Sequence, residues 1–292
     1  MKFTKGLAQT TCYNYNSDLG MWNRWLESAD LDWRNCSPTN VEQFVAQLSH
    51  DGVGAHTVAR KISCLATLYK WGMRNNVVQE DRFYQIEKPK RPRRMPVWLE
   101  VEEQAELMRA TRNYDDIPEN VFGRSREFSI GVRQRYELLF ELFQKSGLRI
   151  SEALGLKVQH IRVVDGVAKH VRVIGKGNKE RQVPLPESFG RVLALSLVGK
   201  NSEDYVFAKK TGGKPPGSHA ARAYLKKLLE KTNIEKKITP HKLRHTYATR
   251  LLENGNAQLV DIQALLGHES IATTQIYTHA GQERLSKLVA DI

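Results

Sequence analysis

The chain has 292 residues, of which 40% are hydrophobic and 26% are charged, and its formal net charge is +13. This length fits two domains better than one, and the composition is that of a globular protein with real cores. The sequence contains no apolar run of about 18 residues and no signal-peptide stretch at its start, which excludes a membrane-spanning helix and leads us to expect a cytosolic (cytoplasmic) protein without a membrane partner.

The positive charge is unevenly distributed. Residues 1–86 carry nine basic and eight acidic side chains, whereas the remainder carries 36 basic and 24 acidic ones. A basic excess of this size indicates a polyanionic partner such as DNA. The three cysteines, Cys12, Cys36 and Cys64, are odd in number and widely spaced, so we expect free thiols rather than disulfides or a zinc site.

The N-terminal part follows helical periodicity. Apolar residues at helical spacing predict helices over 10–28, from Ser37-Pro38-Thr39 to near Gly52, and over 55–73, with a short fourth helix near 81–84. Tyr13 and Trp22 belong to an aromatic stripe that we assign to a core. Residues 1–86 are therefore predicted to form a small helical bundle.

A basic, proline-rich stretch follows at 87–96, with three prolines and five basic residues in ten positions. It reads as an extended linker. It is either a solvated tether or a strap along DNA phosphates. The net charge favours the strap, which makes its basic residues DNA-binding candidates: Lys88, Lys90, Arg91, Arg93 and Arg94.

Residues 97–292 alternate helix and strand. Helices are predicted over 100–111 and 133–145, with a polar, irregular loop at 113–131 between them. Three strand candidates, 158–164, 170–174 and 181–185, are joined by glycine-containing turns and predict a small antiparallel sheet. The chain beyond is mainly helical, so the fold class is mainly α with a small antiparallel β-sheet.

Basic residues occur in two unusual settings in this part. Arg149 lies where a glycine break meets a new helix, between apolar neighbours, which makes simple exposure unfavourable. Lys176 and Lys179 lie at the tip of a glycine-flanked hairpin. The hairpin does not match a nucleotide-binding P-loop, because the G-x-x-x-x-G-K-[ST] spacing and a following helix are missing.

Two histidines and an arginine lie on one predicted helix, which Thr239 caps. His241 and Arg244 are three residues apart and therefore neighbours. His241 and His245 have zinc-compatible spacing, but Lys242 stands where a metalloprotease motif has glutamate, so we expect no metal.

Two further chemical groups come near the C-terminus. His268 directly follows a helix that ends at Gly267, and Tyr277 lies about two turns into a helix that Ser270 can cap. By itself, each group is typical of a surface or packing residue.

Together and in this order, these segments resemble the tyrosine recombinases, and most of all Xer-type recombinases and compact mobile-element integrases. The resemblance rests on residues 147–152, 175–181, 241–245, 265–268 and 273–279 and covers the chain from 96 onward by motif. It extends to the N-terminus by architecture. It implies a helical, SAM-like core-binding domain (1–86), the linker (87–96) and an α+β catalytic domain (97–292), which form a C-shaped clamp on DNA.

The resemblance also implies the chemistry. Tyr277 matches the nucleophile, which forms a 3′-phosphotyrosyl bond, and Lys176 matches the general acid. The two phosphate-clamping arginines and the two histidines that bind phosphate oxygens or move protons match Arg149, Arg244, His241 and His268. Glu152 matches an orienting acidic position, and Lys179 and Arg181 are expected to contact DNA. No metal, ATP or other cofactor is required, because cations of the chain stabilise the phosphoryl charge.

The implied partner is a double-stranded DNA core site, bound by a dimer, with a homotetramer joining two sites through a Holliday junction. A second recombinase or an accessory protein is left open, as are integration, excision, and dimer or cointegrate resolution. The apolar face of 283–292 fits docking on a neighbouring protomer or on its own domain. The 113–131 loop, which is longer than in compact Xer-type chains, fits contact with DNA or a partner.

Two other functions fit the same scaffold: a non-enzymatic DNA-binding protein and a type IB topoisomerase-like enzyme. The presence of Lys176 and Tyr277 disfavours the first, and the Xer-like motifs disfavour the second.

Overall fold

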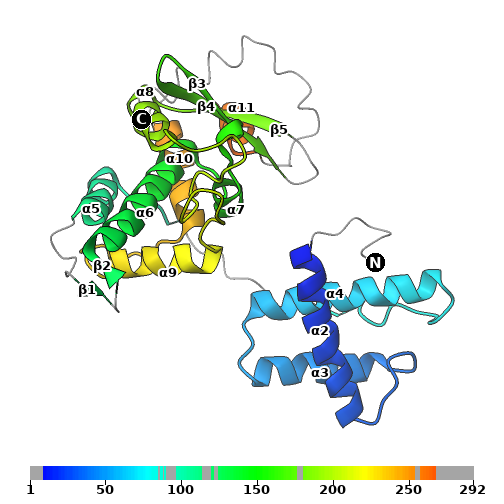
Figure 1. Ribbon diagram of the computed structural model, residues 1–292. Coiled ribbons are helices and arrows are strands. Elements are labelled where there is room, and N and C mark those ends of the chain that lie inside the picture. The colour runs from blue at the N-terminus through cyan, green and yellow to red at the C-terminus, as the bar shows by residue number, and fades with distance from the viewer. Residues whose placement is uncertain are drawn as a thin grey trace. The chain divides into compact units, whose positions relative to one another are not determined.

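The computed structural model describes residues 9–84, 86, 87, 89, 97–113, 120, 121, 124–175, 180–253 and 257–267. The chain divides into two units, Met1–Met95 and Pro96–Ile292, and this division falls inside the basic stretch 87–96 (Figure 1). The fold is mainly helical with a small three-stranded antiparallel sheet, as the sequence predicts. None of the helices described is long and apolar enough to cross a membrane.

The first unit contains α2 (Gln9–Ser28), α3 (Pro38–His50) and α4 (Ala55–Arg74), close to the predicted helices. The start of α3 is fixed by a reciprocal cap. The backbone N–H of Asn40 donates to Ser37 Oγ at 3.2 Å, and the backbone N–H of Ser37 donates to the Asn40 side chain at 2.9 Å. Pro38 occupies the first turn, where its missing N–H costs nothing.

The core of the first unit is aromatic, as the sequence predicts. Trp22 is 2% exposed, stacks on Trp25 at 5.2 Å between ring centroids and meets Phe44 edge-on at 4.8 Å. The prediction was wrong for Tyr13, which is 76% exposed. Helical spacing places Tyr13 on the apolar side, but the described residues of α3 and α4 do not cover it there.

A buried carboxylate links α2 to α4. The Asp18 side chain is fully buried and accepts hydrogen bonds from Arg60 and, at 3.0 Å, from the Lys61 ammonium. A buried charge of this kind is tolerated only when it is paired. The predicted short helix near residues 81–84 is wrong: this segment forms a single turn, in which Asp81 accepts from the backbone N–H of Phe83 and Tyr84.

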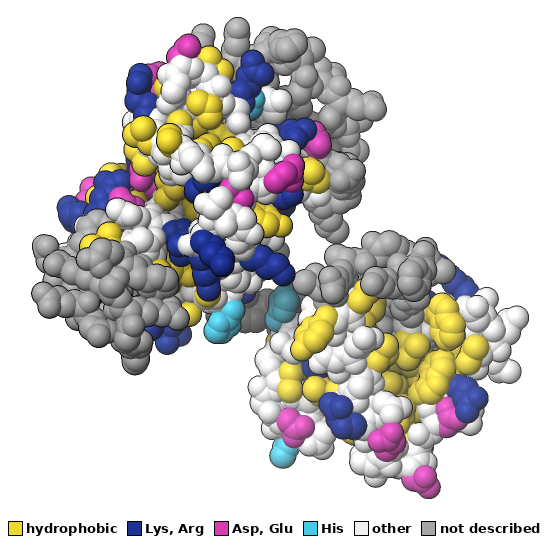
Figure 2. All heavy atoms as spheres, in the orientation of Figure 1, with side chains coloured by type: hydrophobic (Ala, Val, Ile, Leu, Met, Phe, Trp, Pro, Cys, Tyr) yellow, Lys and Arg dark blue, Asp and Glu magenta, His cyan; other side chains and the backbone are white. Residues whose placement is uncertain are grey.

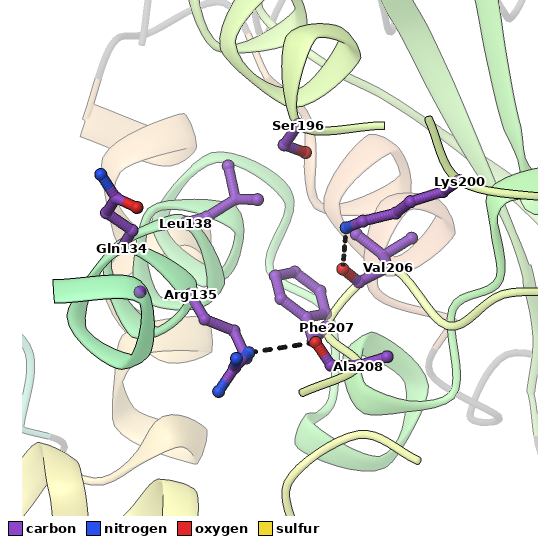
Figure 3. Close-up of a pocket in the computed structure, with 9 residues that line it drawn as sticks. Gln134, Arg135, Leu138, Ser196, Lys200, Val206, Phe207 and Ala208 are labelled. Carbon is purple, nitrogen blue, oxygen red and sulfur yellow. Dashed lines mark hydrogen bonds between the residues drawn. The ribbon is translucent and has the colours of Figure 1, made fainter. Parts of the chain in front are cut away.

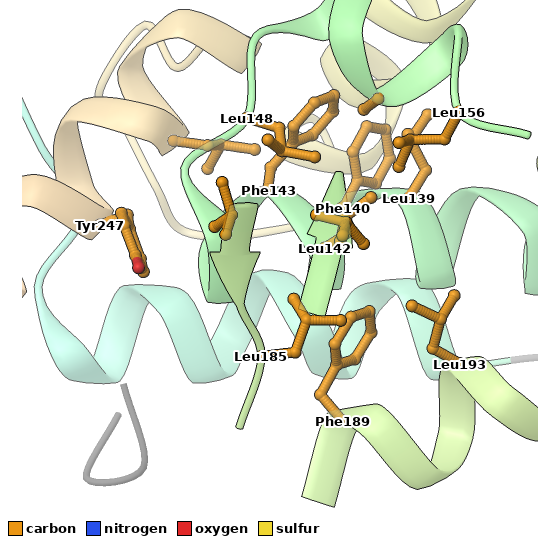
Figure 4. Packing of buried hydrophobic residues seen from close by; sticks show 14 of the residues in the cluster. Leu139, Phe140, Leu142, Phe143, Leu148, Leu156, Leu185, Phe189, Leu193 and Tyr247 are labelled. Atoms are coloured by element: carbon orange, nitrogen blue, oxygen red, sulfur yellow. The ribbon is translucent and has the colours of Figure 1, made fainter. Parts of the chain in front are cut away.

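The second unit is built around α6 (Arg126–Ser146), which contacts α5 (Val101–Arg112), α8 (Glu187–Ser196) and α10 (Pro240–Glu253) (Figure 1). The remaining helices are α7 (Ile150–Leu154), α9 (Ser218–Leu229) and α11 (Leu259–Leu266). Figure 4 shows large apolar side chains of α6 packed together with side chains on and before α8. Among them are Phe140, Phe143, Leu185 and Phe189, all at most 6% exposed.

Helix α6 begins earlier than predicted. Residues 113–131 are predicted to form an irregular loop, but this stretch contains a short hairpin, β1 (Asn120–Val121) and β2 (Arg124–Ser125), and the first turns of α6. Gly131, the last residue of the predicted loop, lies inside α6. One glycine lowers helix stability by about 1 kcal/mol, which a long buried helix tolerates.

The three-stranded sheet has the order β3 (Ile161–Val164), β4 (Val167–Ile174), β5 (Glu180–Pro184), with antiparallel neighbours. Val171 pairs with Ile161 on one side and with Val183 on the other, and α8 packs against β4. The first predicted strand is too long at its start. Residues 158–160 form a 3-10 turn, because the N–H groups of Val158 and Gln159 bind carbonyls of Asp204 and Ser202 instead of β4.

All three cysteines are free thiols, and Cys36 and Cys64 are buried. The sequence predicts this state.

Gly147 makes the turn from α6 into α7. Its φ of +60° lies in the left-handed region that glycine adopts without strain. A Cβ at this position would lie 2.4 Å from Cδ1 of Tyr247 and 2.8 Å from Cδ2 of Leu266. The turn therefore depends on glycine for both its backbone conformation and the close approach of α10 and α11.

We predict that Gly147→Ala lowers the free energy of unfolding by about 3 kcal/mol, since left-handed strain and overpacking add. Gly166→Ala is the matched control, because Gly166 also has a positive φ (+71°) but open space around it. The control should cost about 1 kcal/mol, the backbone strain alone. Urea unfolding of both variants measures the difference, and equal losses would contradict the packing argument.

Candidate active site

Three arginines from separate elements meet at the C-terminal end of α11. Arg149 is the N-cap residue of α7, Arg181 lies in β5, and Arg244 lies in the first half of α10. Helix α11 contacts both α10 and β5, as the labels in Figure 1 allow the reader to follow. The fold thus brings together side chains that are up to 95 positions apart in the sequence.

The Glu152 carboxylate lies between the arginines and is 6% exposed. Its Oε1 accepts from Nη1 of Arg149 at 2.8 Å and from Nη1 of Arg181 at 3.0 Å. Its Oε2 accepts from Nη2 of Arg181 and from the backbone N–H of Arg149, both at 2.8 Å. The last bond also caps α7, because Glu152 is the third residue of that helix.

The same arginines bind three consecutive main-chain carbonyls at the end of α11. Arg181 Nε donates to the Leu265 carbonyl at 2.9 Å, and Arg244 Nη2 donates to the Leu266 carbonyl at 2.6 Å. Arg149 Nη2 donates to the Gly267 carbonyl at 3.0 Å. Carbonyls at a helix C-terminus lack partners within the helix and carry partial negative charge, so guanidinium groups stabilise them.

Gly267 ends α11 in the left-handed conformation, with φ +64°, and its N–H donates to the Gln263 carbonyl at 2.8 Å. A Cβ at Gly267 would lie 3.1 Å from Nη1 of Arg181. Glycine therefore both ends the helix and leaves room for the Arg181 guanidinium.

Arg244 is 2% exposed, which is rare for an arginine. Besides Leu266 it binds the Gly147 carbonyl at 2.8 Å, and its Nη1 lies 3.9 Å from Glu152. Burial and the positive charge of Arg149 lower the pKa of Arg244 to about 10, whereas the charge of Glu152 opposes this change. The guanidinium thus stays protonated at neutral pH.

His241 lies one turn before Arg244 on α10, and its backbone position follows the predicted cap. Thr239 Oγ1 accepts from the N–H of Lys242 at 3.3 Å. Partial burial of the ring, together with the charges of Arg244, His245 and Arg149, lowers the pKa of His241. The imidazole is therefore mainly neutral at pH 7 and can accept a hydrogen bond or a proton.

The structure brings together five of the residues selected from the sequence: Arg149, Glu152, Arg181, His241 and Arg244. Lys176, His268 and Tyr277 lie outside the described residues. The same holds for six of the residues expected to contact DNA: Lys88, Lys90, Arg91, Arg93, Arg94 and Lys179.

Arg181 was expected to contact DNA and is placed differently. Its side chain is 13% exposed, and its guanidinium faces Glu152 and Leu265 within the chain. The sequence holds a signal for this position: Val183 is buried, and side chains two apart share a sheet face. Strand alternation therefore predicts that Arg181 points inward with Val183.

The arrangement favours an anion. Three guanidinium groups surround one carboxylate, which leaves an excess of positive charge. The Arg149 side chain is 38% exposed, and its Nε–H has no acceptor among the residues that the structure describes. A phosphate group has the charge and the planar pairs of oxygens that arginine binds.

A separate pocket of about 230 Å³ lies between α6 and residues 196–208, and none of the arginine-cluster residues lines it (Figure 3). The two basic side chains that line this pocket bind main-chain carbonyls. Arg135 Nε donates to the Ala208 carbonyl at 3.2 Å, and Lys200 donates to the Val206 carbonyl at 2.7 Å. The Arg135 bond ties the 200–208 segment to α6, and the Lys200 bond holds that segment together, so both side chains have a structural role.

Basic side chains are also spread over the surface of the second unit, on the face shown in Figure 2. The same view shows apolar side chains on the surface of the first unit, and large exposed ones in that unit include Tyr13, Trp71 and Tyr84. The surface charge alone therefore does not single out one site, whereas the buried arginine cluster does.

Comparison with known proteins gives two family matches. The profile described as "Phage integrase family" matches residues 98–284, and the one described as "Phage integrase, N-terminal SAM-like domain" matches residues 1–76. Tyrosine recombinase XerD of Staphylococcus saprophyticus is 32% identical, over 99% of this chain and 94% of the relative. Tyrosine recombinase XerC of Vibrio cholerae is 33% identical, over 97% of this chain and 86% of the relative.

Solved structures share the fold at lower identity. A lambda integrase (75–356) dimer bound to a COC′ core site aligns with a TM-score of 0.69 and 18% identity, covering 94% of this chain and 93% of that one. The XerH recombinase in a post-cleavage complex with a palindromic difH substrate aligns with a TM-score of 0.70 and 20% identity, covering 97% and 80%. A lambda integrase tetramer bound to a Holliday junction aligns with a TM-score of 0.66 and 17% identity, covering 94% of this chain and 75% of that one.

We predict that Glu152→Gln lowers the free energy of unfolding by about 3 kcal/mol at pH 7, because it leaves buried arginines without their counter-charge. Burial alone would raise the pKa of Glu152, but the bonds from Arg181 and Arg149 outweigh burial and lower it. The ionised form therefore stabilises the fold above the ordinary pKa of 4.5, and this stabilisation is lost as pH falls through the lowered value.

The difference between wild type and Glu152→Gln should consequently shrink below pH 4.5. Urea unfolding across this pH range measures it. Glu203→Gln is the control, since Glu203 pairs with Lys157 but is 66% exposed, and it should leave the free energy of unfolding nearly unchanged. If Glu152→Gln lowers the free energy of unfolding by the same amount at every pH, the stabilisation by Glu152 does not come from its charge.

Proposed function

The chain belongs to the phage integrase family and is a tyrosine recombinase, an enzyme for site-specific DNA recombination, and on this basis we propose that Tyr277 is its nucleophile. The Tyr277 oxygen attacks a backbone phosphate of the DNA, the bond from phosphorus to the 5′-oxygen breaks, and a 3′-phosphotyrosyl bond forms. The free 5′-hydroxyl of a partner strand then attacks the same phosphorus and releases the tyrosine. The covalent intermediate conserves the phosphoester, so no ATP is needed.

Arg149 and Arg244 clamp the reacting phosphate. The feature that supports this role best is the arginine cluster around Glu152. It holds the guanidinium groups of Arg149 and Arg244 near one carboxylate, which leaves a net positive charge. Phosphoryl transfer depends mainly on positioning and on stabilisation of the charge that develops in the transition state. Since Glu152 and the α11 carbonyls already order these arginines, little reorganisation is needed when DNA binds.

His241 completes the described part of the site. Its lowered pKa keeps the ring neutral at pH 7, so it can bind the phosphate through its N–H or take the phenol proton. His268 likewise donates a hydrogen bond to a phosphate oxygen or moves a proton, and Lys176 protonates the departing 5′-oxygen. The cations of the chain supply the positive charge, so the reaction proceeds without a metal ion.

The substrate is a double-stranded core site that binds two protomers, and two such sites pair in a tetramer through a Holliday junction. The lambda integrase dimer on a core site and the tetramer on a junction share this fold, which supports the proposal. The basic residues of 87–96 lie along DNA phosphates, and Lys179 adds a contact from the hairpin. The exchange serves integration and excision or the resolution of dimers or cointegrates.

The nucleophile is tested with nicked suicide duplexes. Random-sequence duplexes are first enriched by binding to the full chain, and nicks are then tiled through the enriched sequence. We expect wild type to give a covalent protein–DNA adduct on denaturing gels, also in EDTA. Tyr277→Phe, which lacks only the hydroxyl, should bind the duplex equally well and give none.

An adduct that persists in Tyr277→Phe would reject this tyrosine as the nucleophile. Binding without any adduct in wild type would favour a non-enzymatic DNA-binding protein. Relaxation of supercoiled plasmids that lack the enriched sequence would favour a topoisomerase.

The C-terminal segment 283–292 is proposed to dock on a neighbouring protomer, since Leu285, Leu288, Val289 and Ile292 fit one apolar helical face. A chain that ends at Gln282 should keep its unfolding temperature within about 2 °C, a change of about 1 kcal/mol or less for this size. It should bind DNA as a monomer but lose cooperative assembly, measured by native gels and light scattering on the enriched duplex. Unchanged cooperativity, or a large loss of stability, would instead favour docking on its own domain.

A further inference from the structure

The guanidinium of Arg181 makes three hydrogen bonds, one from each of its three nitrogens. Nη1 and Nη2 bind the two oxygens of Glu152, at 3.0 and 2.8 Å, and Nε binds the Leu265 carbonyl at 2.9 Å. Only an arginine can make a bidentate pair with a carboxylate and keep a third donor for another acceptor. Its position therefore joins β5, α7 and the end of α11.

Each Glu152 oxygen receives one bond from Arg181 and one from Arg149. A carboxylate held on both oxygens cannot rotate, so the Arg149 side chain is oriented against a fixed acceptor. Without Arg181, Oε2 would still accept from the backbone N–H of Arg149, but Oε1 would keep only the bond from the Arg149 side chain, so that side chain would lose an acceptor that a second element holds in place.

The contact with Leu265 has a second effect. Leu265 is followed by the two residues whose carbonyls bind Arg244 and Arg149. By holding the carbonyl that precedes them, Arg181 fixes the end of α11 against which both other arginines lie. The left-handed Gly267 leaves room for this contact.

From this geometry we propose that Arg181 is a positioning residue of the recombinase site, acting on Arg149 and Arg244 through Glu152 and the end of α11. This role rests on the proposed function of those two arginines. It differs from a DNA contact, because the Arg181 side chain is 13% exposed and its donors face inward.

The strand that carries Arg181 does not depend on it. Backbone pairing of β5 with β4 runs from Glu180 to Pro184, and the fully buried Val183 anchors the strand in the core. Variants of Arg181 are therefore expected to fold. Arg181→Lys keeps the positive charge, so it can replace Arg181→Gln in the test if Arg181→Gln does not fold.

The test compares Arg181→Gln and Arg181→Lys with Arg191→Gln in the full chain. Arg191 also pairs with a carboxylate, Glu187, but is 62% exposed on α8, so this control removes one charge elsewhere. Single-turnover cleavage of the enriched suicide duplex at saturating protein is expected to fall about 10- to 100-fold in Arg181→Gln, as for a small misplacement of reacting groups. The cleavage rate of Arg181→Lys should fall less. The affinity of both Arg181 variants for DNA should change by less than about threefold, the scatter of such comparisons.

A second readout needs no DNA. The side-chain N–H signals of Arg149 and Arg244, recorded by NMR on the free protein, should lose their protection from solvent exchange in Arg181→Gln and keep it in Arg191→Gln. The backbone spectrum of β4 should stay unchanged in both, because the strand pairing is retained. A purely structural defect would change the backbone spectrum as well.

Two results would overturn the proposal. In one, Arg181→Gln leaves both the cleavage rate and the arginine signals unchanged. In the other, it weakens DNA binding while cleavage at saturation stays normal, which is the behaviour of a direct DNA contact. If wild type itself forms no adduct, the proposed function fails, and the NMR comparison still decides whether Arg181 orders the other two arginines.

Discussion

The second unit depends on one ionic arrangement, the Glu152 carboxylate shared between arginines that the fold would otherwise have to keep apart. Like charges at this distance repel, and Arg244 is almost fully buried. One carboxylate and a row of main-chain carbonyls offset that repulsion and replace the lost hydration. An enzyme that must hold guanidinium groups ready for phosphate can therefore store them in the free state as part of its own structure.

The surrounding fold is arranged to make this possible. A left-handed glycine at each of two helix ends lets α6 turn into α7 and lets α11 stop beside β5. Tyr247 packs on the first of these glycines, and its neighbour on α10, Arg244, binds the carbonyl of the same residue. Packing and charge placement thus share the same few backbone positions, so a change in one alters the other.

Much of this could be predicted from the sequence, and the rest could not for identifiable reasons. Helical periodicity located α2 to α5 within one or two residues, and motif order selected Arg149, Glu152 and Arg244. The early start of α6 was missed because the stretch 113–131 is polar and irregular in pattern, and the turn at 158–160 was missed because its partners are tertiary. Strand alternation with Val183 indicates that Arg181 points inward, but main-chain acceptors such as the Leu265 carbonyl leave no side-chain signature, so the partners of Arg181 required coordinates.

The arginines bind the backbone of residues 265–267 rather than their side chains. This recognition is blind to side-chain chemistry. Leu265 and Leu266 are constrained by the apolar core space that they fill, and another apolar residue of similar volume would present the same carbonyls. The glycine that follows has no such freedom. At positions 265 and 266, other apolar side chains of similar volume can therefore replace leucine without disturbing the charge arrangement. Position 267 requires glycine.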